Sequence, residues 1–568
     1  MAARVLSAAL AVALCLPVVI RAQEPDTTAL LRALNFEGAG KYREAAVQYK
    51  DALKGADPVS ALLGLERAYA QLQWTDSLLA PLDSLIAAEP REPAFRAAQL
   101  RAYSMLSRDA EVRRAFDAWV KAVPGSPDPY REYSRLLLEQ GRAAAADSVI
   151  ALAGRNLGTT SSLQMELAQS RAALGEWESS AMAWRGALSA MPDLDQAAAY
   201  SLARTPEITR ATIRAVFMSP PVDVGSRRAL SDLEATWGSA ADGWAALRDL
   251  PPDSESVDAW LDFARQAEAD ERWSLARDAY VAALAWHPTP AIAVRAATAA
   301  LNAGDPGAAL ALLPTTGVDS AHAASIVLPL RVRALAAEGK PADAEALVNE
   351  YSTVLVPAQR APLEQAVAFG WVRAGDLPRA RRALAGAGPD ADSSDAAGWL
   401  ALYDGDLAGA RAILRNSTDA SPDLARALGL ITRMKEDSAT DVGLAFLQLA
   451  RQDSAGAATA FERAATHHTD VAPALLGVAA QLRAARGDAA GAVAIWTHIL
   501  GAYPQSPEAP AAELAWARQL RGTGAAAGAV QHLEHMILSY PDSALLPQAR
   551  RELELARQAI PGGGQGGL

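Results

Sequence analysis

The sequence predicts an all-α protein, an α-α superhelix built from stacked helical hairpins, and two observations lead to that prediction. A short pattern recurs about every 34 residues in the first third of the chain, with apolar residues three or four apart inside each copy. Apolar residues make up 51% of the chain and charged residues 21%, so every copy has side chains to bury. We expect roughly 11–15 hairpins and a C-terminal capping helix, since a solenoid needs a polar end.

Residues 1–22 have the composition of a cleaved signal peptide. Arg4 precedes an apolar run that Pro17 interrupts, and Ala22 offers a small residue for cleavage. The run from Val5 to Ile20 has 16 residues, which is short of the roughly 20 that span a bilayer. We therefore expect export to the periplasm, cleavage after Ala22, and no spanning segment in the mature chain.

The single cysteine, Cys15, lies inside this segment. The mature chain would then have no disulfide, no thiol nucleophile and no cysteine metal ligand. Lipidation needs a small residue directly before the cysteine, and Leu14 stands there. We do not expect an outer-membrane lipoprotein.

Residues 26–192 contain five repeat units, which we interpret as an N-terminal array. The aligned small or aliphatic positions are Ala45, Leu78, Val112, Ala146 and Ser180. Larger residues follow four positions later, at Tyr49, Leu82, Phe116, Ile150 and Trp184. A third column follows after three more residues, at Ala52, Leu85, Trp119, Ala153 and Ala187. The small residue lets two helices approach closely, and the large one lies on the same face and fills the groove between them.

The unit at 257–290 is the most regular in the chain. Its pattern residues are Trp260, Ala264, Trp273, Ala276, Tyr280, Ala283 and Pro288. This arrangement resembles the tetratricopeptide repeat family, with Phe263 where leucine is usual and Glu271 in place of the turn glycine. The resemblance implies paired helices whose concave groove binds other proteins.

The rest of the chain divides into four parts. Two Pro-Pro pairs disturb the register in 193–256, where we expect two or three degenerate hairpins, with a linker as the alternative. A weaker array follows over 257–544, with Phe461 and Trp496 as core residues. Apolar residues three and four apart predict a capping helix over 545–560, and residues 561–568 form a glycine-rich tail.

We find no motif for catalysis, for a cofactor or for a metal ion. There is no P-loop, no His-Glu-x-x-His and no nucleophile elbow. The adjacent His467 and His468 are expected to point apart. His532 and His535 are expected to face solvent on a helix, with a transition-metal site that includes His498 as the alternative. An enzyme within 193–256 is a third hypothesis, which would need a cluster of titratable residues. The candidates there are Asp223, Arg227, Arg228, Asp232 and Glu234, and they match no catalytic motif.

The groove lies along the first helix of each unit, and its predicted partner-binding residues are in the third and fourth units. These are Arg101, Met105, Arg131, Arg135 and Glu139, beside Ala97. The arginines could meet an acidic peptide. Solvated surface arginines are the alternative interpretation.

Charge and a second resemblance narrow the function. A net charge of −12 with no basic block argues against nucleic acid as a partner. "AYPQSPEAP" and "SYPDSALLP" in the last 80 or so residues are similar to periplasmic repeat proteins of outer-membrane assembly and the Tol-Pal system. We therefore expect an exported, non-enzymatic scaffold or adaptor that binds a protein or peptide and serves envelope assembly or maintenance. The alternative is a glycan-binding or exopolysaccharide-export subunit, in which Trp399 and Trp516 would be exposed.

Overall fold

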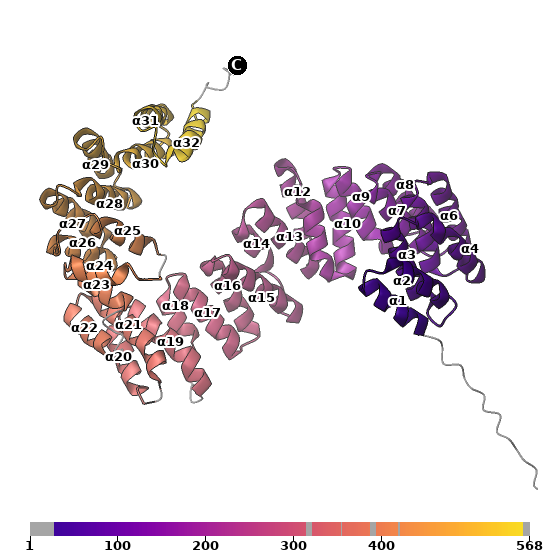
Figure 1. Ribbon diagram of the computed structural model, residues 1–568, viewed down its shortest axis with the longest axis horizontal. Coiled ribbons are helices and arrows are strands. Elements are labelled where there is room, and N and C mark those ends of the chain that lie inside the picture. Colours follow the sequence, from indigo (N-terminus) through magenta and orange to yellow (C-terminus); the bar gives the residue numbers. More distant parts are fainter. Residues whose placement is uncertain (1–27, 314–320, 354, 387–393, 419–420, 561–568) are drawn as a thin grey trace, which may run out of the picture. The chain divides into compact units, whose positions relative to one another are not determined.

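The structure, a computed structural model, describes residues 28–313, 321–353, 355–386, 394–418 and 421–560, and within them the regular structure is helical (Figure 1). The predicted signal peptide and glycine-rich tail lie outside these ranges. The chain forms two compact units that divide between Ala259 and Trp260. The division falls within α15 (Ser254–Ala269). Each unit is described by itself.

The first unit contains fourteen α-helices before α15 in the part of the chain that the structure describes. They are α1 (Thr28–Gly38), α2 (Tyr42–Ala52), α3 (Pro58–Leu72), α4 (Leu79–Ala88), α5 (Pro93–Met105), α6 (Asp109–Ala122), α7 (Asp128–Glu139), α8 (Ala143–Leu157), α9 (Gln164–Ala173), α10 (Trp177–Ala190), α11 (Asp195–Leu202), α12 (Glu207–Met218), α13 (Val224–Trp237) and α14 (Ala240–Leu247). Short 3₁₀ turns cover Thr75–Leu78, Ser161–Leu163 and Pro192–Leu194.

The second unit continues the series. Its helices are α16 (Trp273–Trp286), α17 (Pro290–Asn302), α18 (Pro306–Leu312), α19 (Ala321–Ala337), α20 (Pro341–Glu350), α21 (Pro357–Ala374), α22 (Leu377–Ala385), α23 (Asp395–Tyr403), α24 (Leu407–Leu414), α25 (Pro422–Ile431), α26 (Thr440–Ala450), α27 (Ser454–His467), α28 (Ala472–Ala485), α29 (Ala489–Ala502), α30 (Ala509–Gly522), α31 (Ala526–Ser539) and α32 (Leu546–Gln558). The all-α stack predicted from the sequence is confirmed.

Helices pack mainly against their neighbours in the chain (Figure 1). In the first unit the first helices of successive hairpins also contact one another, in the order α1, α3, α5, α7 and α9. The same holds for α17, α19, α21 and α23 in the second unit. Each unit therefore has a layer of first helices, and burial accumulates from neighbour to neighbour along the series.

The predicted repeat-core residues are all buried. Ala45, Tyr49, Ala52, Phe116, Trp184, Ala276, Tyr280, Ala283, Phe461 and Trp496 are at most 3% exposed. Tyr49 illustrates the packing, because a Cβ added to Gly64 of α3 would lie 2.2 Å from the Tyr49 ring. The missing side chain lets α3 lie directly on the aromatic ring of α2.

The turn between paired helices needs a left-handed residue, and glycine is not the only one that supplies it. Gly141 has φ +73°, and Glu271, which replaces glycine in the 257–290 unit, has φ 56°. A turn closed by backbone hydrogen bonds, such as that from Arg272 N–H to the Ala267 carbonyl oxygen, therefore tolerates a side chain there at a modest cost in backbone energy.

Residues 193–256 are helical and packed. α12 lies on α10, and α13 lies on α11. Ile213, Phe217 and Leu230 join the core around Trp184. The guanidinium of Arg185 donates to the carbonyl oxygens of Val216 at 2.8 Å and Pro221 at 2.7 Å, which fixes the first Pro-Pro turn.

One helix breaks the pairing in the second unit. α23 packs directly on α26, although α24 and α25 lie between them in the sequence, and α24 is the helix that pairs with α23. The contact is close because Gly443 of α26 faces the turn at Gly405, where a Cβ on Gly443 would lie 2.6 Å from the Leu402 carbonyl oxygen. α25 is therefore an insertion in the array.

The capping helix is confirmed as α32. Ala549, Leu553 and Ala556 are buried on its inner face against α31 and α30, and Arg550 and Arg551 are exposed. Across the described residues, no helix is both long enough and apolar enough to cross a membrane.

Candidate peptide-binding groove

The arginines predicted to bind a partner are already paired within the first unit. Arg101 of α5 donates to Glu66 of α3 at 2.7 Å and to Glu132 of α7 at 3.0 Å. The hydrogen bonds to Glu66 raise the pKa of the Arg101 guanidinium above its ordinary value. One charge thus joins three successive first helices.

The same pattern continues on α7. Arg131 bonds Asp128 at 2.8 Å and the buried Glu166 of α9 at 3.1 Å. Arg135 bonds Glu132 at 2.7 Å and Glu139 at 3.2 Å. Met105 is 55% exposed and Ala97 is half-buried. Partner binding by these residues stays a prediction, and an acidic ligand would have to displace the chain's own carboxylates.

The expectation for His467 and His468 is wrong, and in the other pair His535 is exposed as expected while His532 is half-buried. His467 Nδ1 and His468 Nε2 do not point apart, since they contact the two oxygens of Asp441 at 2.9 and 3.0 Å. His532 and His535 contact the two oxygens of Glu513, a carboxylate that is 2% exposed, at 2.5 and 2.6 Å. Both arrangements hold neighbouring helices together, and no group with metal-site geometry occurs among the described residues.

Trp399 and Trp516, which the glycan alternative requires to be exposed, are half-buried. The Trp399 ring stacks on Tyr403, with centroids 6.0 Å apart. The Trp516 ring lies 4.1 Å from the His532 ring. Packing within the chain therefore uses a large part of each ring.

The second unit contains a groove that sequence reasoning missed. Two clefts of about 690 Å³ and 410 Å³ share the residues Gln481, Trp496, Ala511 and Ala515. Their walls come from α25, α28, α30 and the start of α32, and α29 contributes Trp496 and Ile499. We call these two joined clefts the C-terminal groove.

Small residues make the groove possible. Ala425 and Gly429 of α25, Ala474 and Gly477 of α28, and Ala511 and Ala515 of α30 line it. Because these side chains are short, the neighbouring helices leave room above the nearly buried Trp496 ring. The signal available in the sequence was this run of alanine and glycine at inner positions, where earlier units have arginine and tyrosine.

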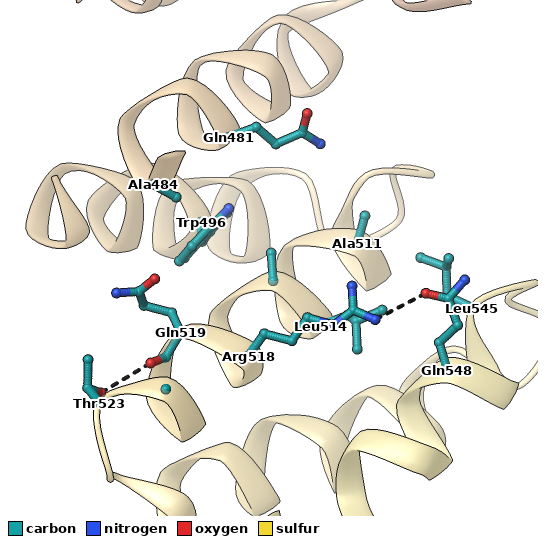
Figure 2. Close-up of a pocket in the computed structure, with 12 residues that line it drawn as sticks. Gln481, Ala484, Trp496, Ala511, Leu514, Arg518, Gln519, Thr523, Leu545 and Gln548 are labelled. Carbon is teal, nitrogen blue, oxygen red and sulfur yellow. Dashed lines mark hydrogen bonds between the residues drawn. The ribbon is translucent and has the colours of Figure 1, made fainter. Parts of the chain in front are cut away.

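Three side-chain amides line the first cleft beside Arg518 and Thr523 (Figure 2), and the second cleft also contains Arg426, Arg433 and Glu508. Gln481 and Gln519 make no side-chain hydrogen bond within the described chain, and Gln548 accepts from Arg518 at 3.2 Å. Arg518 also donates to Glu552 at 3.0 Å. An amide both donates and accepts, so it matches the N–H and C=O of a peptide bond.

An ion pair lies in the wall of the second cleft. Arg433, after α25, donates to Glu508 at the start of α30. This pair links α25 to α30.

Comparisons with known proteins add little to this description. No protein-family model matches the chain, and no curated protein matches it. One solved structure that does match is a crystal structure of the APC/C hetero-tetramer Cut9-Hcn1, with 12% identity over 93% of this chain and 96% of that chain and a TM-score of 0.23. The class of this protein, an array of stacked α-helical hairpins, follows from its own helices.

Proposed function

We propose that this chain is an exported scaffold, without catalytic activity of its own, that binds segments of protein partners in the C-terminal groove. The observation that carries the proposal is the continuity of the two clefts along α25, α28 and α30. A long groove with an apolar floor and amide groups suits an extended or helical peptide, because side chains enter it while the amides bond the backbone.

The glycan alternative lacks an aromatic platform in this groove. Sugars stack on exposed rings, and the groove's tryptophan, Trp496, is 3% exposed. The half-buried Trp399 and Trp516 do not line either cleft. We therefore favour a protein partner.

Place of action is the second part of the proposal. The apolar N-terminal run and the Tyr-Pro-x-Ser pattern near the C-terminus support export to the periplasm and a role in assembling or maintaining the cell envelope. Cell fractionation and N-terminal sequencing test this directly. We expect the mature chain in the periplasmic fraction, beginning at Gln23; a full-length chain in the cytoplasm would contradict it.

Site-specific photocrosslinking in intact cells tests groove binding. A photoreactive residue at Gln481 or Ala511, both in the groove, should trap the same partner protein. The control is Thr497, which is exposed on α29 and lines neither cleft. Equal trapping from Thr497, or none from the groove positions, would contradict the proposal.

A further inference from the structure

A separate cleft in the second unit contains two arginines. It has a volume of about 310 Å³ and lies where α17, α19 and α21 end. Its polar lining is Asn302, Arg333 and Arg373, and Phe369 is the aromatic residue of an otherwise aliphatic wall. We call it the arginine cleft.

Neither arginine has a carboxylate partner in the described part of the chain. Arg373 donates from Nη2 to the Ala336 carbonyl oxygen at 3.0 Å, and its buried Nε–H has no acceptor. Arg333 is exposed and makes no side-chain hydrogen bond or ion pair there. Burial lowers the pKa of Arg373, and the ionisable group that acts on it most is the phenol of Tyr403.

The first unit shows what completes such arginines. There, Arg101 and Arg131 each bond a carboxylate from a neighbouring first helix, Glu66 and Glu166 respectively. In the arginine cleft, the neighbouring first helices contribute Asn302 and alanines instead. A desolvated guanidinium with an unused N–H gains most from a carboxylate, which accepts two parallel hydrogen bonds.

We propose that the arginine cleft binds glutamate or aspartate side chains in an acidic segment of a partner protein. Arg373, held by Ala336, offers a fixed donor, and Arg333 is free to close on the ligand. Asn302 adds an amide, and Phe369 gives an apolar surface for the residue beside the acid. A nucleic acid needs a longer track of cations than two arginines provide. This site is distinct from the C-terminal groove and does not depend on its role.

Fluorescence anisotropy with the full chain at low salt tests the proposal. The probe is a labelled twelve-residue peptide with two central glutamates and one leucine, both of its ends blocked so that only side chains carry charge. The matched peptide has glutamine at both positions. We expect the glutamate peptide to bind about tenfold more tightly, and Arg333→Gln to remove about that advantage.

Controls separate binding from folding. Arg463→Gln changes an exposed arginine on α27 that lines no cleft described here, and it should leave the affinity unchanged. Arg373→Lys keeps the charge but removes the planar fork, so it should weaken binding less than Arg373→Gln at matched thermal stability.

Three results would overturn the proposal. The first is equal binding of the two peptides, and the second is full affinity of Arg333→Gln for the glutamate peptide. The third is a cleft that does not bind the glutamate peptide but binds a fluorescent phosphate analogue, which inorganic phosphate displaces. Ala511→Arg, which fills the C-terminal groove, should leave this binding unchanged, so failure at one site is distinguishable from failure at the other.

Discussion

At the residue scale, each repeat depends on small side chains at helix contacts. Ala283 of α16 has no exposed surface and lies where α17 packs. We predict that Ala283→Arg lowers the free energy of unfolding by roughly 2–4 kcal/mol, because a long charged side chain has no room or partner there. The matched control, Ala285→Arg, is two residues along on the exposed side. Urea unfolding followed by circular dichroism measures both, and equal midpoints would show that the alignment of this unit is wrong.

The contact of His468 with Asp441 makes stability depend on pH. Burial lowers the pKa of His468, but bonds to Asp441 and Glu436 outweigh it, so the net pKa is raised. Burial raises the pKa of Asp441, but the hydrogen bonds to His467 and His468 outweigh burial, so the net pKa of Asp441 is lowered. The contact of His468 with Asp441 therefore stabilises the folded chain fully between about pH 4, the pKa of aspartate in the unfolded chain, and about pH 6.5, that of histidine.

We predict that Asp441→Asn lowers the free energy of unfolding by about 1–2 kcal/mol at pH 5.5 and by clearly less at pH 9, since the histidine contribution is lost as pH rises through the raised pKa of His468. Urea unfolding of both proteins at the two pH values gives the comparison. Asp470→Asn controls for charge, because Asp470 is exposed and makes no side-chain hydrogen bond or ion pair in the described part of the chain. A cost that is independent of pH would contradict the role of His468.

At the element scale, the contact of α23 with α26 rests on Gly443. A Cβ there would lie 2.6 Å from the Leu402 carbonyl oxygen and 2.7 Å from the Gly405 nitrogen, both backbone atoms. We predict that Gly443→Ala destabilises the protein by roughly 1–3 kcal/mol, because the helices must separate. Gly501→Ala, in α29, has open space around the new Cβ and should stabilise slightly. Thermal unfolding measures the change in melting temperature of the two variants. A change of the same sign in both would contradict the close contact at Gly443.

The elements also show what the sequence can and cannot predict. Hairpins in 26–192 and the cap α32 follow from local spacing, because each helix contacts its neighbours in sequence. The insertion of α25 does not, since α23 and α26 meet across 36 intervening residues. The pairing of Arg101 with Glu66 was detectable, because their separation of 35 residues is close to one repeat. The run of alanine and glycine that lines the C-terminal groove is visible in the sequence, but it does not by itself indicate a groove, since alanine and glycine also fill ordinary helix contacts.

At the scale of the whole molecule, stability accumulates between neighbouring helices, with no single core. We predict that deleting α32 and the residues after it speeds hydrogen exchange in α30 and α31 while exchange in α1–α10 stays unchanged. The reason is that α32 covers Ala529, Leu533 and Met536 of α31 and also contacts α30, so its loss exposes these two helices. Hydrogen exchange with mass spectrometry resolves the two regions. Faster exchange throughout the chain would indicate one cooperative core instead.

Binding of the partner in the C-terminal groove of the second unit is tested most directly by one affinity measurement. The protein trapped from Gln481 and Ala511 is purified, and its dissociation constant is measured for the unchanged chain, for Ala511→Arg and for Thr497→Arg. We predict that Ala511→Arg weakens binding at least about tenfold, because it fills the C-terminal groove, and that Thr497→Arg leaves it unchanged. Equal affinity of all three chains, with their folds intact, would contradict the claim.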